Sequence, residues 1–198
     1  MSAPPKTVLT ASAEEQAAIR AAVRAAKGHT VAGREHVDGL VALLADLQVS
    51  DPIYDLPRPI TRETVAQWVA ESEALRQEGR CLLSVNFDEA GEVAGYARFT
   101  VWPERASGEL AGARRADLQN SGGGRSGVAR SIAWMFEGLG LRLIGLTAAL
   151  DNVRSAKAID GAGFKRMGEV ESTRADGTTR RSLYWEMTRA EWERMHRF

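Results

Sequence analysis

The stretch Gln119-Asn120-Ser121-Gly122-Gly123-Gly124-Arg125-Ser126-Gly127 is the most informative part of the chain, because it lies between a predicted strand and a predicted helix. Its three consecutive glycines carry no Cβ, so the backbone can turn sharply and a ligand can touch it. The start of the following helix supplies N–H groups and a positive dipole, which favour an anion, and Arg125 adds a fixed positive charge. The stretch therefore predicts a loop that binds phosphate or pyrophosphate, with a flexible turn as the plain alternative.

The segments that follow the loop predict a helix, a strand, a second helix, a hairpin and a third helix. The apolar run 142–150 predicts a strand that is buried on both faces. Asp151-Asn152 begins the second helix, and the hairpin comprises strands at 168–174 and 179–187. A capping box at 188–191 opens the last helix. The first of these helices is expected to bury five apolar residues at helical spacing: Val128, Ile132, Met135, Phe136 and Leu139.

The segments before the loop predict three helices, an early hairpin and a short strand. A capping box at Ser12–Glu15 opens an Ala-rich helix, and Thr61 caps the third helix. The expected helices are at 13–27, at 35–47 and from Thr61 onward, and the expected strands are at 81–86, 93–102 and 110–115. The second helix is expected to bury Val37, Leu40, Val41, Leu44 and Leu47. This order predicts an α/β fold (α+β, with a mixed sheet flanked by helices) over residues 30–198, preceded by a helical extension at residues 1–29.

The composition excludes several classes of protein. The 198 residues include 26 basic and 26 acidic side chains, so bulk positive charge does not draw this protein to nucleic acid. One cysteine excludes an internal disulfide framework and a Cys-based zinc site, and the three histidines show no metal-binding spacing, so we expect no metal. The chain shows neither a signal peptide nor an apolar run long enough to span a membrane, and we expect a cytoplasmic protein without membrane contact.

Two known nucleotide-binding loops compete for the glycine-rich stretch. A Walker A loop is excluded because no Lys-Ser or Lys-Thr follows the glycines. The pattern G-x-G-x-x-G is present at Gly122, Gly124 and Gly127, but the dinucleotide fingerprint begins almost directly after an apolar strand. Here the polar-leaning segment Asp117–Ser121 intervenes. A nucleotide-dependent oxidoreductase is therefore only a minor alternative.

A different interpretation follows from the order of the motifs. Read as Q-x-x-G-x-G, the stretch resembles the acyl-CoA pyrophosphate loop of the GNAT N-acetyltransferases. Asp151–Ala156 followed by Gly161–Phe164 is similar to the N-x-x-S…GF signature of the RimJ/RimL-like branch. Further stretches resemble the family in the expected order: 92–97, 136–141, 183–184 and 191–192. The resemblance covers about residues 30–195 and implies a GNAT-like fold.

The resemblance also implies an activity. It implies transfer of acetyl from acetyl-CoA to a primary amine, a protein N-terminus or a small amine, by direct attack in a ternary complex of a monomer or homodimer. Arg181-Ser182 stands where RimJ/RimL-like proteins often have Asp-His, which argues against a ribosomal protein as substrate. A protein that binds CoA as a sensor or partner-binding module without turnover is the alternative. The residues implied to contact the cofactor are Gln119, Asn120, Gly122, Gly123, Gly124, Arg125, Ser126, Asn152 and Ser155.

The chemical roles are distributed over a few side chains. By resemblance, Ser155 supplies a proton to the departing thiolate, Tyr184 is a weaker candidate for that role, and a backbone N–H near 114–116 polarises the thioester carbonyl. Asn152 also has a plain explanation as a helix N-cap. Cys81 is expected in the core rather than as a nucleophile.

The general base is left open by the sequence. Glu109, Glu169 and Glu171 all border the expected cleft, and Glu171 is the one we carry forward as catalytic, beside Ser155 and Asn152. The net charge is −5 over residues 1–97 and +3 over residues 98–130, although it is zero overall. This polarity suits a cationic amine on one side of the protein and an anionic cofactor on the other.

Overall fold

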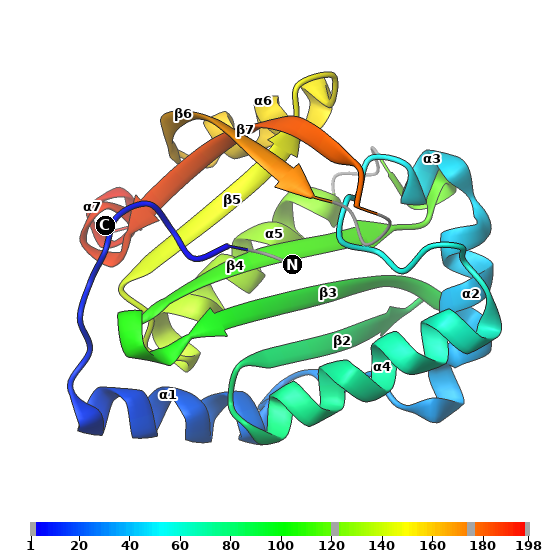
Figure 1. Cartoon of the computed structure of the whole chain (residues 1–198), viewed down its shortest axis with the longest axis horizontal. Helices are drawn as coiled ribbons and strands as arrows, with labels where there is room; N and C mark the ends of the chain where they lie inside the picture. Colours follow the sequence, from blue (N-terminus) through cyan, green and yellow to red (C-terminus); the bar gives the residue numbers. More distant parts are fainter. Residues whose placement is uncertain (1–2, 120–122, 174–176, 197–198) are drawn as a thin grey trace.

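A seven-stranded mixed sheet, in the order β1-β2-β3-β4-β5-β7-β6, forms the centre of the chain (Figure 1). All neighbours are antiparallel except β4 and β5, which run parallel. The strands are β1 Thr30–Val31, β2 Cys81–Phe87, β3 Val93–Trp102, β4 Ser107–Arg114, β5 Leu143–Ala149, β6 Lys165–Thr173 and β7 Thr179–Thr188. The computed structural model describes residues 3–119, 123–173 and 177–196. One parallel pair among six is incompatible with the mostly parallel nucleotide-binding sheet of the oxidoreductase alternative.

Helices cover both faces of the sheet, because neighbouring side chains of each strand point to opposite faces. One core cluster joins α1, α5 and α6 to residues such as Leu82 and Phe99, and the other joins α2 and α4 to residues such as Leu83 and Tyr96. The helices are α1 Ala13–Ala25, α2 Val37–Ala45, α3 Leu47–Ser50, α4 Arg62–Gln77, α5 Gly123–Ala133 with a π-helical turn at Trp134–Gly138, α6 Val153–Gly161 and α7 Arg189–His196. Within the described residues, no helix has the length and apolarity needed to cross a membrane.

The predicted starts of α1, α4 and α7 are confirmed by their caps. At α1 the Ser12 hydroxyl accepts from the Glu15 N–H at 3.1 Å, and the Glu15 carboxylate accepts from the Ser12 N–H at 2.8 Å. Thr188 and Glu191 form the same reciprocal pair at α7, and Thr61 caps α4. These caps satisfy N–H groups that have no partner inside the helix, which is why sequence alone locates them.

Two residues predicted to be buried are exposed. Leu47 is 64% exposed, because the chain leaves the helical conformation at Asp46 and a new short helix begins there, capped by the Asp46 carboxylate. Leu43 is buried in its place. Val128 is 44% exposed, since the buried face of α5 begins only at Ile132.

Strand β4, the third of the predicted strands, begins earlier than predicted. We expected a strand over 110–115 preceded by a loop, whereas β4 runs from Ser107 to Arg114. Gly108 lies inside it, and an added Cβ there would come within 2.7 Å of Leu141 and 2.9 Å of Met135. The glycine therefore permits close packing of Met135, in the π-helical turn after α5, and of Leu141 on the strand, rather than belonging to a loop.

Helix α1 is part of the same hydrophobic core as the sheet. Its Ile19 and Val23 are 2% and 0% exposed and belong to the cluster that contains Phe99 and Phe136. The helix therefore packs on its own chain.

We expect Ile19→Ala to lower the free energy of unfolding by about 2–4 kcal/mol, because it removes buried methylenes and leaves a cavity. Leu47→Ala, a truncation at a largely exposed position, is the control and is expected to change it by less than about 0.5 kcal/mol. Urea unfolding of both variants measures the difference. Equal effects would show that α1 does not belong to the cooperative core.

Candidate active site

The site is built where β4 and β5 part. Their parallel ladder comprises three residue pairs and ends at Glu109↔Gly145, although β4 continues to Arg114 and β5 to Ala149. Beyond that pair, β4 is paired with β3 and β5 with β7. The two strands therefore leave a gap between facing backbone edges.

The edge of β4 that faces the gap can be deduced from hydrogen-bond alternation. The Arg115 N–H donates to the Ala94 carbonyl of β3 at 2.8 Å, so it is directed away from β5. In an antiparallel ladder the next residues along alternate in direction, which turns the N–H groups of Arg114 and Gly112 toward the gap. Among the backbone N–H groups predicted at 114–116, that of Arg115 therefore does not point into the gap. The N–H of Gly112, which was not predicted, points into the gap together with that of Arg114.

Gln119 connects the two sides of the gap. Its amide nitrogen donates to the Arg114 carbonyl at 2.7 Å, and its amide oxygen accepts from the Arg154 guanidinium of α6. The end of β4 and the start of α6 are therefore held together through one side chain. This position fits its expected role at the start of the glycine-rich loop.

The glycine-rich loop is described only in part. Asn120 and Gly122, both predicted to contact the cofactor, lie outside the described residues. The backbone of Gly123, Gly124, Arg125 and Ser126 forms the first turn of α5, so the helix begins earlier than the sequence indicated. The first N–H groups of a helix have no partner within it, and here they belong to the predicted phosphate-binding residues.

Asn152 caps helix α6. Its side-chain oxygen accepts from the Ser155 N–H at 3.1 Å, which confirms the plain interpretation of Asn152. Both residues are half-buried and directly follow β5, the strand on the far side of the gap. Their roles toward a cofactor stay predictions.

A cleft of ≈ 350 Å³ lies on one face of the sheet at the point of parting. It is lined by Glu109 of β4, Thr147 of β5, Tyr184 of β7, Glu171 of β6 and the N-terminal residues Ala3–Lys6. Glu109 is 7% exposed, and one of its carboxylate oxygens accepts from the Thr147 hydroxyl at 3.2 Å. A buried carboxylate thus stands where the two strands separate.

A second buried carboxylate is hydrogen-bonded to Tyr184, which lines the cleft. Glu186 is 5% exposed, accepts from the Tyr184 hydroxyl at 2.6 Å, and accepts from the Thr7 N–H at 2.9 Å. The Tyr184 side chain packs against Gly145. A Cβ added at Gly145 would come within 2.9 Å of the Tyr184 oxygen, so the glycine makes room for the tyrosine. Burial and the neighbouring Glu186 raise the pKa of Tyr184 well above its ordinary range, so the phenol is neutral.

The other candidates take different positions. Glu169 is ion-paired with Arg181 on the neighbouring strand, and Glu171 lines the cleft from an exposed position. Cys81 is 1% exposed, and burial raises the pKa of its thiol, so it remains a neutral core residue as expected. Glu109 was one of the three carboxylates that the sequence offered as a base, although Glu171 was preferred. The predicted strand began at Leu110, whereas β4 begins at Ser107 and includes Glu109.

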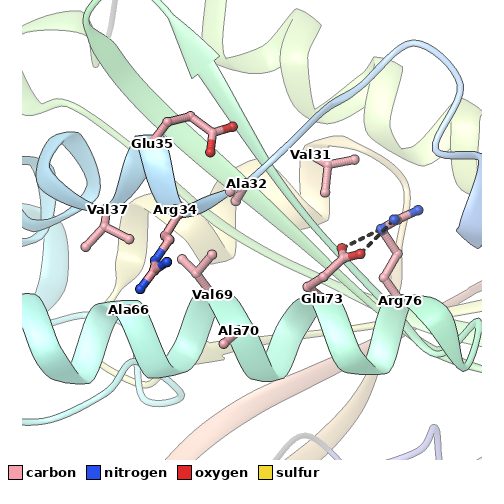
Figure 2. A pocket seen from close by; sticks show the side chains of 11 residues that line it. Val31, Ala32, Arg34, Glu35, Val37, Ala66, Val69, Ala70, Glu73 and Arg76 are labelled. Carbon is pink, nitrogen blue, oxygen red and sulfur yellow. Dashed lines mark hydrogen bonds and ion pairs between the residues drawn. The ribbon is translucent and has the colours of Figure 1, made fainter.

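A larger cavity of ≈ 590 Å³ lies elsewhere, between α4 and the segment Val31–Val37 (Figure 2). Apolar side chains such as Val69 form most of its wall, and the ion pair of Glu73 with Arg76 stands at one end. β1, which carries Val31, is separated from β4 by two strands. The larger cavity is therefore not the place where β4 and β5 part. In the described residues, no group of three or more His, Cys, Asp or Glu is arranged to bind a metal ion.

Comparison with known proteins identifies the family of the chain and solved structures with the same fold. The family described as "Acetyltransferase (GNAT) domain" matches residues 31–165. No curated protein matches the sequence significantly. Many solved structures share the fold.

Three of these structures illustrate the range of relatives. A ribosomal-protein-S5-alanine acetyltransferase from Vibrio fischeri superposes with a TM-score of 0.69 at 17% identity, over 82% of this chain and 92% of that one. AAC(6')-Ib in complex with ribostamycin and coenzyme A gives 0.68 at 21% identity, over 84% and 96%. The spermidine/spermine N-acetyltransferase SpeG from Vibrio cholerae gives 0.68 at 14% identity, over 85% and 97%. At these identities the likeness shows the fold alone.

The Glu186 network predicts an acid-dependent loss of stability. Burial alone would raise the pKa of Glu186, but hydrogen bonds from Thr7 and Tyr184 outweigh it and hold that pKa below its ordinary value. The ionised group therefore stabilises the fold above the ordinary pKa of about 4.3, and this contribution disappears as the pH falls through the lower folded pKa. We expect the unfolding free energy of Glu186→Gln to fall less steeply with acid than that of the wild type.

Urea titrations at a series of pH values between about 7 and 3 measure this difference. Glu89→Gln, at an exposed turn, is the matched control. Identical acid slopes for Glu186→Gln and the wild type would contradict the proposed ionisation.

Proposed function

The chain belongs to the acetyltransferase (GNAT) domain family, and we propose that it is an acetyl-CoA-dependent N-acetyltransferase acting on a primary amine. The observation that carries this proposal is the parting of β4 and β5 directly beside the buried carboxylate of Glu109. The gap offers backbone donors for an acyl-CoA, and the cleft offers a carboxylate for an amine. A structural relative that holds coenzyme A supports the same assignment.

The described residues fit acetyl-CoA. The N–H groups of Gly112 and Arg114 on the free edge of β4 would hold its extended arm, and the first turn of α5 from Gly123 would face its phosphates. Ser155 and Asn152 border the gap from the start of α6. Acetyl-CoA would supply the acetyl group as a thioester whose carbonyl these backbone donors can polarise.

Glu109 is the general base that the geometry favours. It is buried, it lines the cleft, and the Thr147 hydroxyl orients its carboxylate. The amine nitrogen bonds to the acetyl carbon, the C–S bond breaks, the amine proton passes to Glu109, and the departing thiolate takes a proton from Ser155 or solvent. Glu171, the base carried forward from the sequence, lines the same cleft but is exposed. Glu171 would attract a cationic amine to the entrance of the cleft.

The need for a base depends on the acceptor. At pH 7 an α-amine with a pKa of about 7.8 is about 14% neutral, whereas an alkylamine with a pKa of about 10.4 is only about 0.04% neutral. A strongly basic amine therefore requires a carboxylate that removes its proton in the cleft. The thiol has a pKa near 8.5, so proton donation by Ser155 contributes less.

The activity is tested by incubating the purified chain with acetyl-CoA and a panel of primary amines and following the release of free thiol. Calorimetric titration with CoA measures binding independently. We expect binding of CoA and amine-dependent thiol release. Binding without release would support the CoA-sensor alternative, and the absence of both would refute the proposal.

We expect Glu109→Gln to lower kcat by about 10²–10⁴-fold, because the variant keeps the shape of the side chain but cannot accept the amine proton. Glu171→Gln, in the same cleft, is the matched comparison and is expected to raise KM for a cationic amine with a smaller effect on kcat. CoA affinity should be unchanged in both. A larger loss of kcat in Glu171→Gln than in Glu109→Gln would assign the base to Glu171 instead.

A further inference from the structure

The N-terminal segment Ala3–Ala11, which we name the strap, crosses the face of the sheet that carries the cleft. Followed back from α1, it runs over β7 and β5 toward β4 (Figure 1). The family match begins only at residue 31, so the strap is a feature of this chain outside the matched region. Its path brings residues far apart in sequence to the same place as Glu109.

The strap is held by specific bonds along its length. The Thr7 hydroxyl and N–H both donate to the buried Glu186 carboxylate, at 2.5 and 2.9 Å, and the Lys6 N–H donates to the Tyr184 oxygen at 3.2 Å. Further along the strap, the Ala11 N–H donates to the Glu104 carbonyl at 3.0 Å. The strap therefore has a defined position on the sheet.

Lys6 fastens the strap to β6, which also lines the cleft. Its ammonium group donates to the carbonyls of Met167 and Glu169 on β6, each at 3.2 Å, and lies 5.3 Å from the centre of the Tyr184 ring. The positive charge of Lys6 is thereby directed to backbone oxygens. The side chain bridges the strap and β6, and the carboxylates of Glu109 and Glu171 also line the cleft.

Pro5 is the part of the strap nearest the reacting centre. It is buried, and its ring carbon lies 3.4 Å from the position that a Cβ on Gly145 would occupy. Gly145 is the residue paired with Glu109 at the last rung before β4 and β5 part. Pro5 therefore stands beside the end of the cleft where acetyl transfer is expected.

The opposite side of the cleft is closed by a loop. Tyr54 lines the cleft from the segment between α3 and α4, and the Arg180 guanidinium at the start of β7 donates to the Pro52 carbonyl of that segment at 2.8 Å. The cleft thus has a wall on each side, the strap and this loop. Its ≈ 350 Å³ is near the lower end of the range of about 300–1,000 Å³ found for ligand pockets.

We propose that the strap is the wall of the acceptor site that limits the acceptor to small primary amines and excludes peptide N-termini. This inference rests on the proposed function and names its substrate class. An extended peptide advances about 3.3–3.6 Å per residue, so a second or third residue of an acceptor peptide would meet Pro5 or Lys6. A small amine with its positive charge near Glu109 and Glu171 fits within the walls.

The test compares acceptors of increasing size at saturating acetyl-CoA, using n-butylamine, benzylamine and a tetrapeptide with a free α-amino group. For the wild type we expect kcat/KM to fall along this series. Pro5→Ala removes ring atoms from the wall, and Thr7→Val removes the hydroxyl that anchors the strap to Glu186. Both are expected to raise the tetrapeptide-to-butylamine ratio of kcat/KM by about tenfold or more, since one methylene in a pocket changes discrimination by about 10–200-fold.

Val8→Ala is the matched control, because Val8 lies on the same strap and is 67% exposed. Its ratio should equal that of the wild type. The inference is overturned if the wild type acetylates the tetrapeptide as efficiently as butylamine, or if Pro5→Ala and Thr7→Val keep the wild-type ratio. Acetylation of amines without such size dependence refutes this inference alone, whereas the absence of acetylation and of CoA binding refutes the proposed function as well.

Discussion

The parallel backbone ladder between β4 and β5 comprises three residue pairs, and the rest of the site depends on the point where that ladder ends. A strand edge inside a protein carries N–H and C=O groups that need partners. Beyond Glu109, one edge of β4 is not paired with any strand of the described part of the chain, so its donors face the gap in a fixed array. A rigid row of backbone donors that does not have to reorganise is well suited to hold an extended acyl chain and to polarise its carbonyl.

The same parting of strands also determines where charge can be placed. Glu109 is the last residue of β4 with a partner on β5, and Thr147 holds its carboxylate from the neighbouring strand. Glu186 is equally buried but is occupied by Tyr184 and the strap. The two carboxylates thus differ in their surroundings: Glu109 lines the cleft, whereas Glu186 holds the strap and Tyr184 in place.

Local signals in the sequence predicted much of this fold and only part of the site. Caps such as Ser12 with Glu15 depend on residues three apart, and the buried strand before Asn152 is a continuous apolar run, so both can be read directly. The prediction that Leu47 is buried was wrong, because the Asp46 cap interrupts the apolar periodicity of the preceding helix. Glu109 was one of three candidate bases, and the sequence did not favour it over the others because the predicted strand began at Leu110, whereas Gly108 and Glu109 both lie within β4. The strap could not be predicted, since its bonds to Glu186 join residues that lie 179 positions apart.

Amide hydrogen exchange with and without CoA tests the central claim most directly, because it reports on individual backbone N–H groups of β4. The account predicts that CoA slows exchange at Gly112 and Arg114 and in the first turn of α5, while Arg115, whose N–H is bonded to β3, is unaffected. CoA binding that leaves Gly112 and Arg114 unprotected would contradict the claim that the gap between β4 and β5 is the cofactor site.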